Sequence, residues 1–69
     1  MTTYAVLFER ADDRSWSAHA ADLPVFAVGD TREEAEREIR VAITLYLREL
    51  ASRGKPAPET RTQVGTVSI

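Results

Sequence analysis

The stretch from Asp22 to Ala35, DLPVFAVGDTREEA, constrains the fold of this chain more than any other part of it. Its Thr31-x-x-Glu34 spacing is typical of a capping box. In that arrangement the threonine oxygen accepts from the amide of Glu34, and the Glu34 carboxylate accepts from the amide of Thr31. Gly29 ends the preceding apolar run, because glycine adopts backbone angles that other residues avoid. The stretch therefore predicts a short strand over Val25–Val28, followed directly by a helix.

The helix is predicted to run from Arg32 to about Arg53. Its main apolar residues recur at the helical spacing and fall in one arc, which would face a sheet. They are Ala35, Ile39, Ala42, Ile43, Tyr46, Leu47 and Leu50. Gly54 is a typical C-terminal stop, and Pro56 prevents the helix from continuing. Val41 and Leu45 lie outside the arc and one turn apart. They are either scattered exposed residues, which are normal, or a small docking patch.

Alternating side chains predict two strands before this stretch, Tyr4–Arg10 and Trp16–Ala20, paired as an antiparallel hairpin. A last strand, Gln63–Ile69, is expected after the helix. We therefore expect an α+β fold in the order β-β-β-α-β. Its four-stranded mixed sheet would have the last strand parallel to the first, the order 3-2-1-4, and one helix on one face. This order leaves Val25–Val28 at an open edge, where another chain could pair with it.

Size and charge bound the function. A chain of 69 residues predicts a single domain, 1–69, with a core of marginal size. With no cysteine to form disulfides, we expect a homo-oligomer, a dimer or alternatively a tetramer, to stabilise it. Nine Lys and Arg against eleven Asp and Glu give a net charge of −2 with no basic patch, so nucleic-acid binding is not expected. Short apolar runs and a start without a signal-peptide pattern predict a cytoplasmic protein without a membrane span.

No set of residues in the sequence predicts an active site. Asp12 and Asp13 fall in a hairpin turn, where aspartate is favoured for its own backbone hydrogen bonds. His19 lies near Ser17, but a catalytic pair also needs an orienting third group and an oxyanion site. One histidine and no cysteine provide no metal cluster. We therefore expect no catalytic residue, no metal, no cofactor and no enzyme activity.

Partner binding is the remaining class of function. Aromatic residues are enriched at protein interfaces, and either Trp16 or Phe26 could serve one, although core packing is the alternative for each. The open-edge strand is expected to meet a second copy of the chain or another protein. The predicted partner-binding residues are Trp16, Asp22, Phe26, Val28, Val41 and Leu45.

An ordered set of short motifs runs through nearly the whole chain. They are Tyr4–Glu9, Trp16–Ala20, Asp22-Leu23-Pro24, Gly29-Asp30-Thr31, Glu34-Ala35, the helix through Ile43–Leu47, Gly54-Lys55-Pro56 and Pro58-Glu59. In this order and spacing the sequence resembles the HicB-like antitoxin family, whose small N-terminal domain has a partial ribonuclease H-type fold. Val25-Phe26 departs from the Gly-Cys that the family usually has after Asp-Leu-Pro.

The resemblance implies a module that neutralises a toxin. The implied partner is a small, basic HicA-like mRNA interferase, masked by protein contact. Many family members continue into a segment that binds operator DNA, whereas this sequence stops at Ile69. We therefore expect no C-terminal DNA-binding domain. The alternative is a solitary oligomeric HicB-like domain that has lost its toxin and binds a small ligand.

Overall fold

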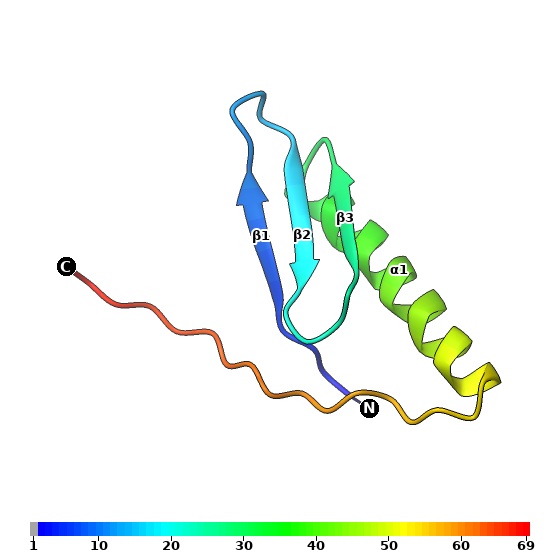
Figure 1. The fold of residues 1–69 in the computed structure, drawn as a ribbon. Helices are drawn as coiled ribbons and strands as arrows, with labels where there is room; N and C mark the ends of the chain where they lie inside the picture. The colour runs from blue at the N-terminus through cyan, green and yellow to red at the C-terminus, as the bar shows by residue number, and fades with distance from the viewer. Residues whose placement is uncertain (1) are drawn as a thin grey trace.

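Three strands and one helix form the fold (Figure 1). The structure of the protein is a computed structural model that describes residues 2–69. Strands β1 (Val6–Arg10), β2 (Trp16–Ala20) and β3 (Phe26–Gly29) form one antiparallel sheet in the order β1-β2-β3. Helix α1 (Arg32–Ser52) packs on one face of this sheet. The predicted α+β class and the order of these four elements are confirmed.

The hairpin between β1 and β2 is closed by a turn whose side chains hydrogen-bond to its own backbone. The Ala11 amide donates to the Ser15 carbonyl at 2.8 Å, and Arg14 adopts a positive φ of 72°. The Asp13 carboxylate accepts from the Ser15 amide at 3.0 Å and from the Ser15 hydroxyl at 2.6 Å. These bonds hold the pKa of Asp13 below its ordinary value. Asp13 thus shapes the turn, as its position in the sequence predicts.

The helix begins and ends as the sequence indicates. The Glu34 amide donates to the Thr31 hydroxyl at 3.1 Å, which satisfies one of the free donors of the first turn. The reciprocal bond differs from the prediction, since the Glu34 carboxylate accepts from the amide of Asp30, at 3.3 Å, instead of that of Thr31. At the other end Gly54 has a φ of +70°, and the Lys55 amide donates to the Leu50 carbonyl at 2.9 Å.

The core between sheet and helix is small. Ala18, Ala35 and Ile39 are its buried members. The half-buried apolar residues around them are Val6, Phe8, Trp16, Val25, Ala27 and Ile43. The Arg32 guanidinium lies 4.1 Å from the centre of the Phe8 ring, which adds a cation–π contact at the helix start. Among residues 2–69 no large side chain is completely buried, so the core of this chain is thin.

The predicted fourth strand is wrong as a part of this chain's own sheet. Gln63–Ile69 has no regular secondary structure and leaves the sheet on the side of β1, as Figure 1 shows. On the predicted inward face this segment carries two apolar side chains, Val67 and Ile69, besides Gln63 and a glycine. Two apolar side chains provide little burial against the backbone entropy lost when a whole strand is ordered. The four-stranded sheet with the order 3-2-1-4 is therefore replaced by a three-stranded sheet.

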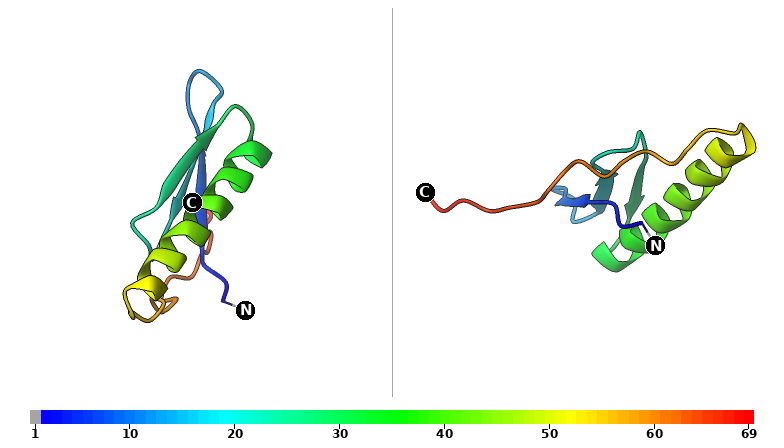
Figure 2. Two further views of the ribbon diagram at one scale, coloured as in Figure 1. Left: turned by 90° about the vertical axis from the view of Figure 1, so that its right-hand side faces the viewer. Right: turned by 90° about the horizontal axis from the view of Figure 1, so that it is seen from below.

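The helix lies off-centre on the sheet. It packs mainly against β3 and β2, so the helix-facing side chains of β1, Val6 and Phe8, are only half-buried. The views in Figure 2 show the sheet as one layer with the helix along one face, and the right-hand view shows the last residues projecting from the body. Because the sheet of residues 2–69 has the order β1-β2-β3, its two outer strands, β1 and β3, are open edges.

No helix in the described part of the chain is long and apolar enough to cross a membrane.

Candidate docking surface at the open edge of the sheet

Four exposed apolar side chains gather where β3 runs beside α1. Phe26 and Val28 on β3 are 66% and 62% exposed, and Val41 and Leu45 on α1 are 55% and 59% exposed. Together with Ala27, Ala42 and Glu38 they line a shallow hollow of about 420 Å³. We call Phe26, Val28, Val41 and Leu45 the β3-edge patch. These four are among the six residues that the sequence predicts to bind a partner.

Local sequence explains why these residues share a surface. On β3, Phe26 and Val28 alternate with Ala27, which packs toward the core, so the two larger side chains point away from it. On α1, Val41 and Leu45 are four residues apart and therefore lie on one flank of the helix. The off-centre position of the helix brings this flank beside β3. Neither periodicity alone places the two pairs side by side.

The backbone of β3 also faces outward at the patch. The Ala20 amide donates to the Val25 carbonyl at 3.0 Å, and Ala18 is the partner of Ala27 in the ladder. Since hydrogen-bonded positions alternate along an antiparallel strand, the N–H and C=O groups of Phe26 and Val28 point away from β2. Within residues 2–69 no strand pairs with this side of β3. The patch thus combines apolar side chains with free backbone donors and acceptors.

His19 contributes to the same surface without a catalytic arrangement. Its imidazole stacks on the Phe26 ring, with centroids 6.0 Å apart and planes 21° from parallel. His19 is the ladder partner of Phe26, which accounts for the contact. No hydrogen bond to the imidazole is found among the described residues, so no group orients it toward Ser17. The imidazole instead lies beside the exposed Phe26 ring and extends the same surface.

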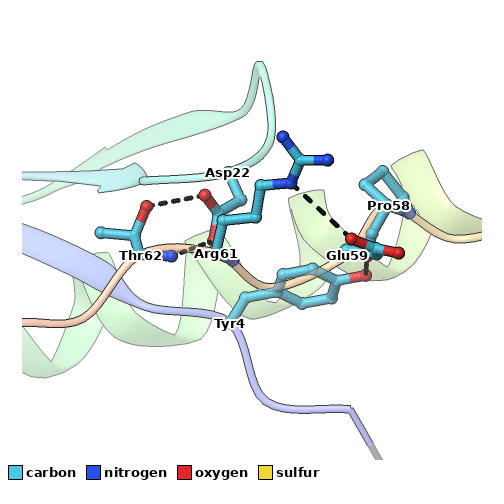
Figure 3. Close-up of polar contacts among 6 residues, drawn as sticks. All are labelled: Tyr4, Asp22, Pro58, Glu59, Arg61 and Thr62. Atoms are coloured by element: carbon cyan, nitrogen blue, oxygen red, sulfur yellow. Dashed lines mark hydrogen bonds and ion pairs between the residues drawn. The ribbon is translucent and has the colours of Figure 1, made fainter.

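The other two predicted residues lie outside the β3-edge patch. Trp16 is half-buried and packs against the core, which favours the core interpretation that the sequence left open for it. Asp22 accepts from the Arg61 amide at 3.0 Å, the Thr62 amide at 3.2 Å and the Thr62 hydroxyl at 2.6 Å (Figure 3). For both residues, a contact with a partner stays a prediction.

The hydrogen bonds to Asp22 hold the last part of the chain against the body. The Thr62 hydroxyl and the Arg61 amide stabilise the ionised carboxylate and hold the pKa of Asp22 below its ordinary value of 3.8. Nearby, the Tyr4 hydroxyl donates to the Pro58 carbonyl at 2.9 Å, as Figure 3 shows. No local pattern in the sequence indicates these contacts, because they join residues 39, 40 and 54 positions apart. We call Tyr4 and Asp22 the tail anchor.

The acidic residues do not converge on a concave site. Asp13 is engaged by Ser15 and Asp22 by Thr62, while Glu36 and Glu49 pair with arginines on the exposed helix surface. In the range 2–69 no three His, Asp or Glu side chains lie close enough to hold a metal ion. Residues 2–69 therefore present an exposed apolar patch, and their acidic side chains assemble no such metal site.

Comparison with known proteins agrees with the sequence motifs. A family model for the HicB-like antitoxins of bacterial toxin–antitoxin systems matches residues 4–68, which is nearly the whole chain. No curated protein and no solved structure matches it. The match covers the strands, the helix, the tail anchor and nearly all of the last segment. It confirms the resemblance that the motifs indicate.

Proposed function

The chain belongs to the HicB-like antitoxins of bacterial toxin–antitoxin systems, and we propose that it neutralises a toxin by covering it with the β3-edge patch. The partner in this proposal is a small, basic HicA-like mRNA interferase. The antitoxin acts through protein contact alone, and residues 1–69 work as a single module that makes no contact with nucleic acid. Such a pair acts in the cytoplasm, where mRNA is translated.

The observation that carries the proposal is the open β3 edge with its four exposed apolar side chains. An edge strand with free backbone groups can add a strand of another chain, which provides affinity through main-chain hydrogen bonds. Natural proteins usually protect such edges with lysine, proline or a bulge. β3 reads FAVG and contains none of these. An edge left open in this way, with Phe26 and Leu45 beside it, is what a protein partner would use.

The charge of the chain supports a basic partner. The net charge is −2, and Glu38 lines the hollow beside Val41 and Leu45. Complementary charge speeds association and discriminates against wrong partners. A basic residue of the toxin could pair with Glu38 at the rim, while apolar residues occupy the hollow. This arrangement would add selectivity to the affinity of the apolar contacts.

The proposal includes stoichiometric inhibition without catalysis. His19 stacks on Phe26, and Asp13 and Asp22 are engaged in hydrogen bonds that shape the chain. General acid–base catalysis requires such groups to meet a substrate within hydrogen-bond reach. We infer that the protein has no hydrolytic or nucleolytic activity, and that one antitoxin chain occupies one toxin. Its effect on RNA cleavage would then saturate at the concentration of the partner.

A second candidate function is a solitary oligomeric domain without a toxin. A groove of about 660 Å³ between β1 and α1 favours it, because a groove of this size could hold a small ligand. In that case the β3-edge patch would meet a second copy, in a homodimer or a tetramer. The gene next to the one for this protein distinguishes the two functions. A short basic reading frame with a single essential histidine beside this gene supports the antitoxin.

A charge placed in the patch tests the proposal. Phe26→Lys should weaken association with the protein encoded by that neighbouring frame at least about tenfold, since buried aromatic anchors dominate binding energy. The matched control is Val64→Lys, because Val64 is 64% exposed and lies outside the patch. Titration calorimetry measures both, and circular dichroism checks that α1 is intact. Equal affinities of Phe26→Lys and the wild type would contradict the proposed surface.

A further inference from the structure

The last residues of the sequence form an exposed segment with an alternating pattern. Val67 is 86% exposed and Ile69 is fully exposed. In an extended chain these two point to one side, and Val64 points to the other. The radius of gyration is 13.4 Å, against about 11 Å for a compact chain of this length, since the segment projects from the body. Gln63–Ile69, which we call the tail strand, thus has the alternating pattern of a β-strand but pairs with no sheet in the described residues.

On the opposite edge from the β3-edge patch, the fold leaves a groove. Because α1 is displaced toward β3, the helix-facing side of β1 lies open. The apolar side chains along this groove come from both elements and are Val6, Phe8, Ile39, Ile43 and Leu47. All but Ile39 are only half-buried. The groove is about 660 Å³ and follows the edge of β1, as a further strand would.

The backbone of β1 is ready for such a strand. The Ala21 amide donates to the Ala5 carbonyl at 3.0 Å, and Leu7 is the ladder partner of His19. Since hydrogen-bonded positions alternate, the N–H and C=O groups of Val6 and Phe8 point away from β2. No strand in the described part of the chain pairs with this side of β1. Both the edge and the groove beneath it therefore lack a partner.

We propose that the tail strand of one copy adds to β1 of a second copy, and that the second copy returns its own tail strand in the same way. Val67 and Ile69 would enter the groove of the partner, while Val64 stays on the outer face. At about 3.3 Å per residue, the tail strand is long enough to run along the five-residue β1. The exchange is reciprocal and closes a symmetric dimer.

The tail anchor favours a second copy over the chain's own β1. Asp22 holds Arg61 and Thr62, and Tyr4 holds Pro58, so the chain is fixed just before the tail strand begins. From that point the tail strand runs away from its own sheet on the β1 side (Figure 1). It would have to bend back toward the sheet to reach its own β1, whereas its present course leads away from the body, where a second copy could bind it.

This inference is independent of the proposed toxin masking, and its dimer differs from one formed through the β3-edge patch. The exchange uses β1 and its groove, which leaves both β3-edge patches of the dimer free for other partners. Phe26→Lys should therefore leave the dimer intact. Unchanged toxin binding by Phe26→Lys, with an unchanged dimer, would contradict the masking surface alone.

Self-association tests the burial of the tail strand. Val67→Asp should weaken the dimer at least about tenfold, because it places a carboxylate in an apolar groove twice in each dimer. Val64→Asp is the control, since it adds the same charge to the outer face of the same segment. Sedimentation equilibrium measures both dissociation constants. A Val67→Asp protein that dimerises as tightly as the wild type would overturn the exchange.

Cross-linking distinguishes exchange from return to the same chain. The chain has no cysteine, so single thiols can be introduced cleanly at Leu7 and at Thr66. A Leu7→Cys copy mixed with a Thr66→Cys copy should form a covalent mixed dimer with a short thiol cross-linker. A chain that carries both substitutions is treated with the same cross-linker for comparison. If cross-links form only within that chain and not between the mixed copies, the proposal is overturned in favour of an internal fourth strand. A dimer without either cross-link would also overturn it, since another surface would then hold the copies together.

Discussion

Gly29 is the position where one added methyl group should have the largest effect on stability. It is buried at the end of β3, where the strand passes the first turn of α1. A Cβ at this position would lie 2.6 Å from the Ala35 nitrogen and 3.0 Å from the carbonyl carbon of Glu34. Both atoms belong to the helix backbone and cannot rotate away as a flexible side chain would. Gly29→Ala therefore requires the strand and the helix to move apart.

The expected cost follows from this overlap. Overpacking a well-packed site typically costs about 1–3 kcal/mol. Replacing glycine also reduces the entropy of the unfolded chain, which returns about 0.4–1 kcal/mol. We expect a net loss of about 1–2 kcal/mol in the free energy of unfolding. For a domain of this size, that loss lowers the Tm by about 5–15 °C.

Thermal unfolding followed by circular dichroism measures the effect. The control is Gly65→Ala, because no atom lies within 4 Å of a Cβ built on Gly65. The wild type and both variants are compared at one protein concentration, since self-association would make the Tm depend on it. We expect a lower Tm for Gly29→Ala and a nearly unchanged one for Gly65→Ala. Equal melting temperatures of Gly29→Ala and the wild type would refute the close approach of β3 to α1.

Two further predictions concern the helix start and the tail anchor. Thr31→Ala removes the hydroxyl that caps the Glu34 amide and should lower the free energy of unfolding by about 1 kcal/mol, as denaturant titration can measure; an unchanged midpoint would contradict the cap. Because the folded pKa of Asp22 lies below its ordinary value of 3.8, its stabilisation of the tail is present above that value and is lost as the pH falls through the folded pKa. The Arg61 and Thr62 amide signals in nuclear magnetic resonance should therefore shift together below about pH 3.8, and Asp22→Ala should abolish that transition.

The sequence predicted the secondary-structure elements that form because of residues close together in the chain. The hairpin follows from alternation within Trp16–Ala20 and from the turn residue Asp13. The helix follows from its cap at Thr31, its apolar spacing and its stop at Gly54. Each of these signals acts over a few residues, so the pattern alone contains it. The structure confirms β2 and the start of α1 at the predicted residues and changes the other strand bounds by one or two positions.

The prediction of a fourth strand was wrong because strand formation there does not depend on the local sequence alone. The alternation in the last residues is genuine, but a strand also needs an edge to pair with and enough burial to offset its ordering. Asp22 fixes Thr62 where the segment leaves the chain's own sheet, and no pattern near either residue signals that contact. The strand that the alternation predicted over this segment is therefore absent from the chain's own sheet.

The sequence singles out the four residues of the β3-edge patch but does not predict that they lie side by side. Val41 and Leu45 stand out because they leave the apolar arc of the helix, and Phe26 and Val28 because their strand carries no charge. Their meeting depends on where α1 packs, which is mainly on β3 and β2. That position is a property of the whole fold, so no local pattern predicts it.

The measurement that tests the central claim most directly is a titration of RNA cleavage. The basic HicA-like protein encoded beside this gene is incubated with RNA. Cleavage is followed as the antitoxin is added in increasing amounts. Masking predicts a linear loss of cleavage that ends near equimolar chains, and a titration by Phe26→Lys that requires a large excess. RNA degradation by this protein alone, abolished by Asp22→Asn or His19→Ala, would contradict the account.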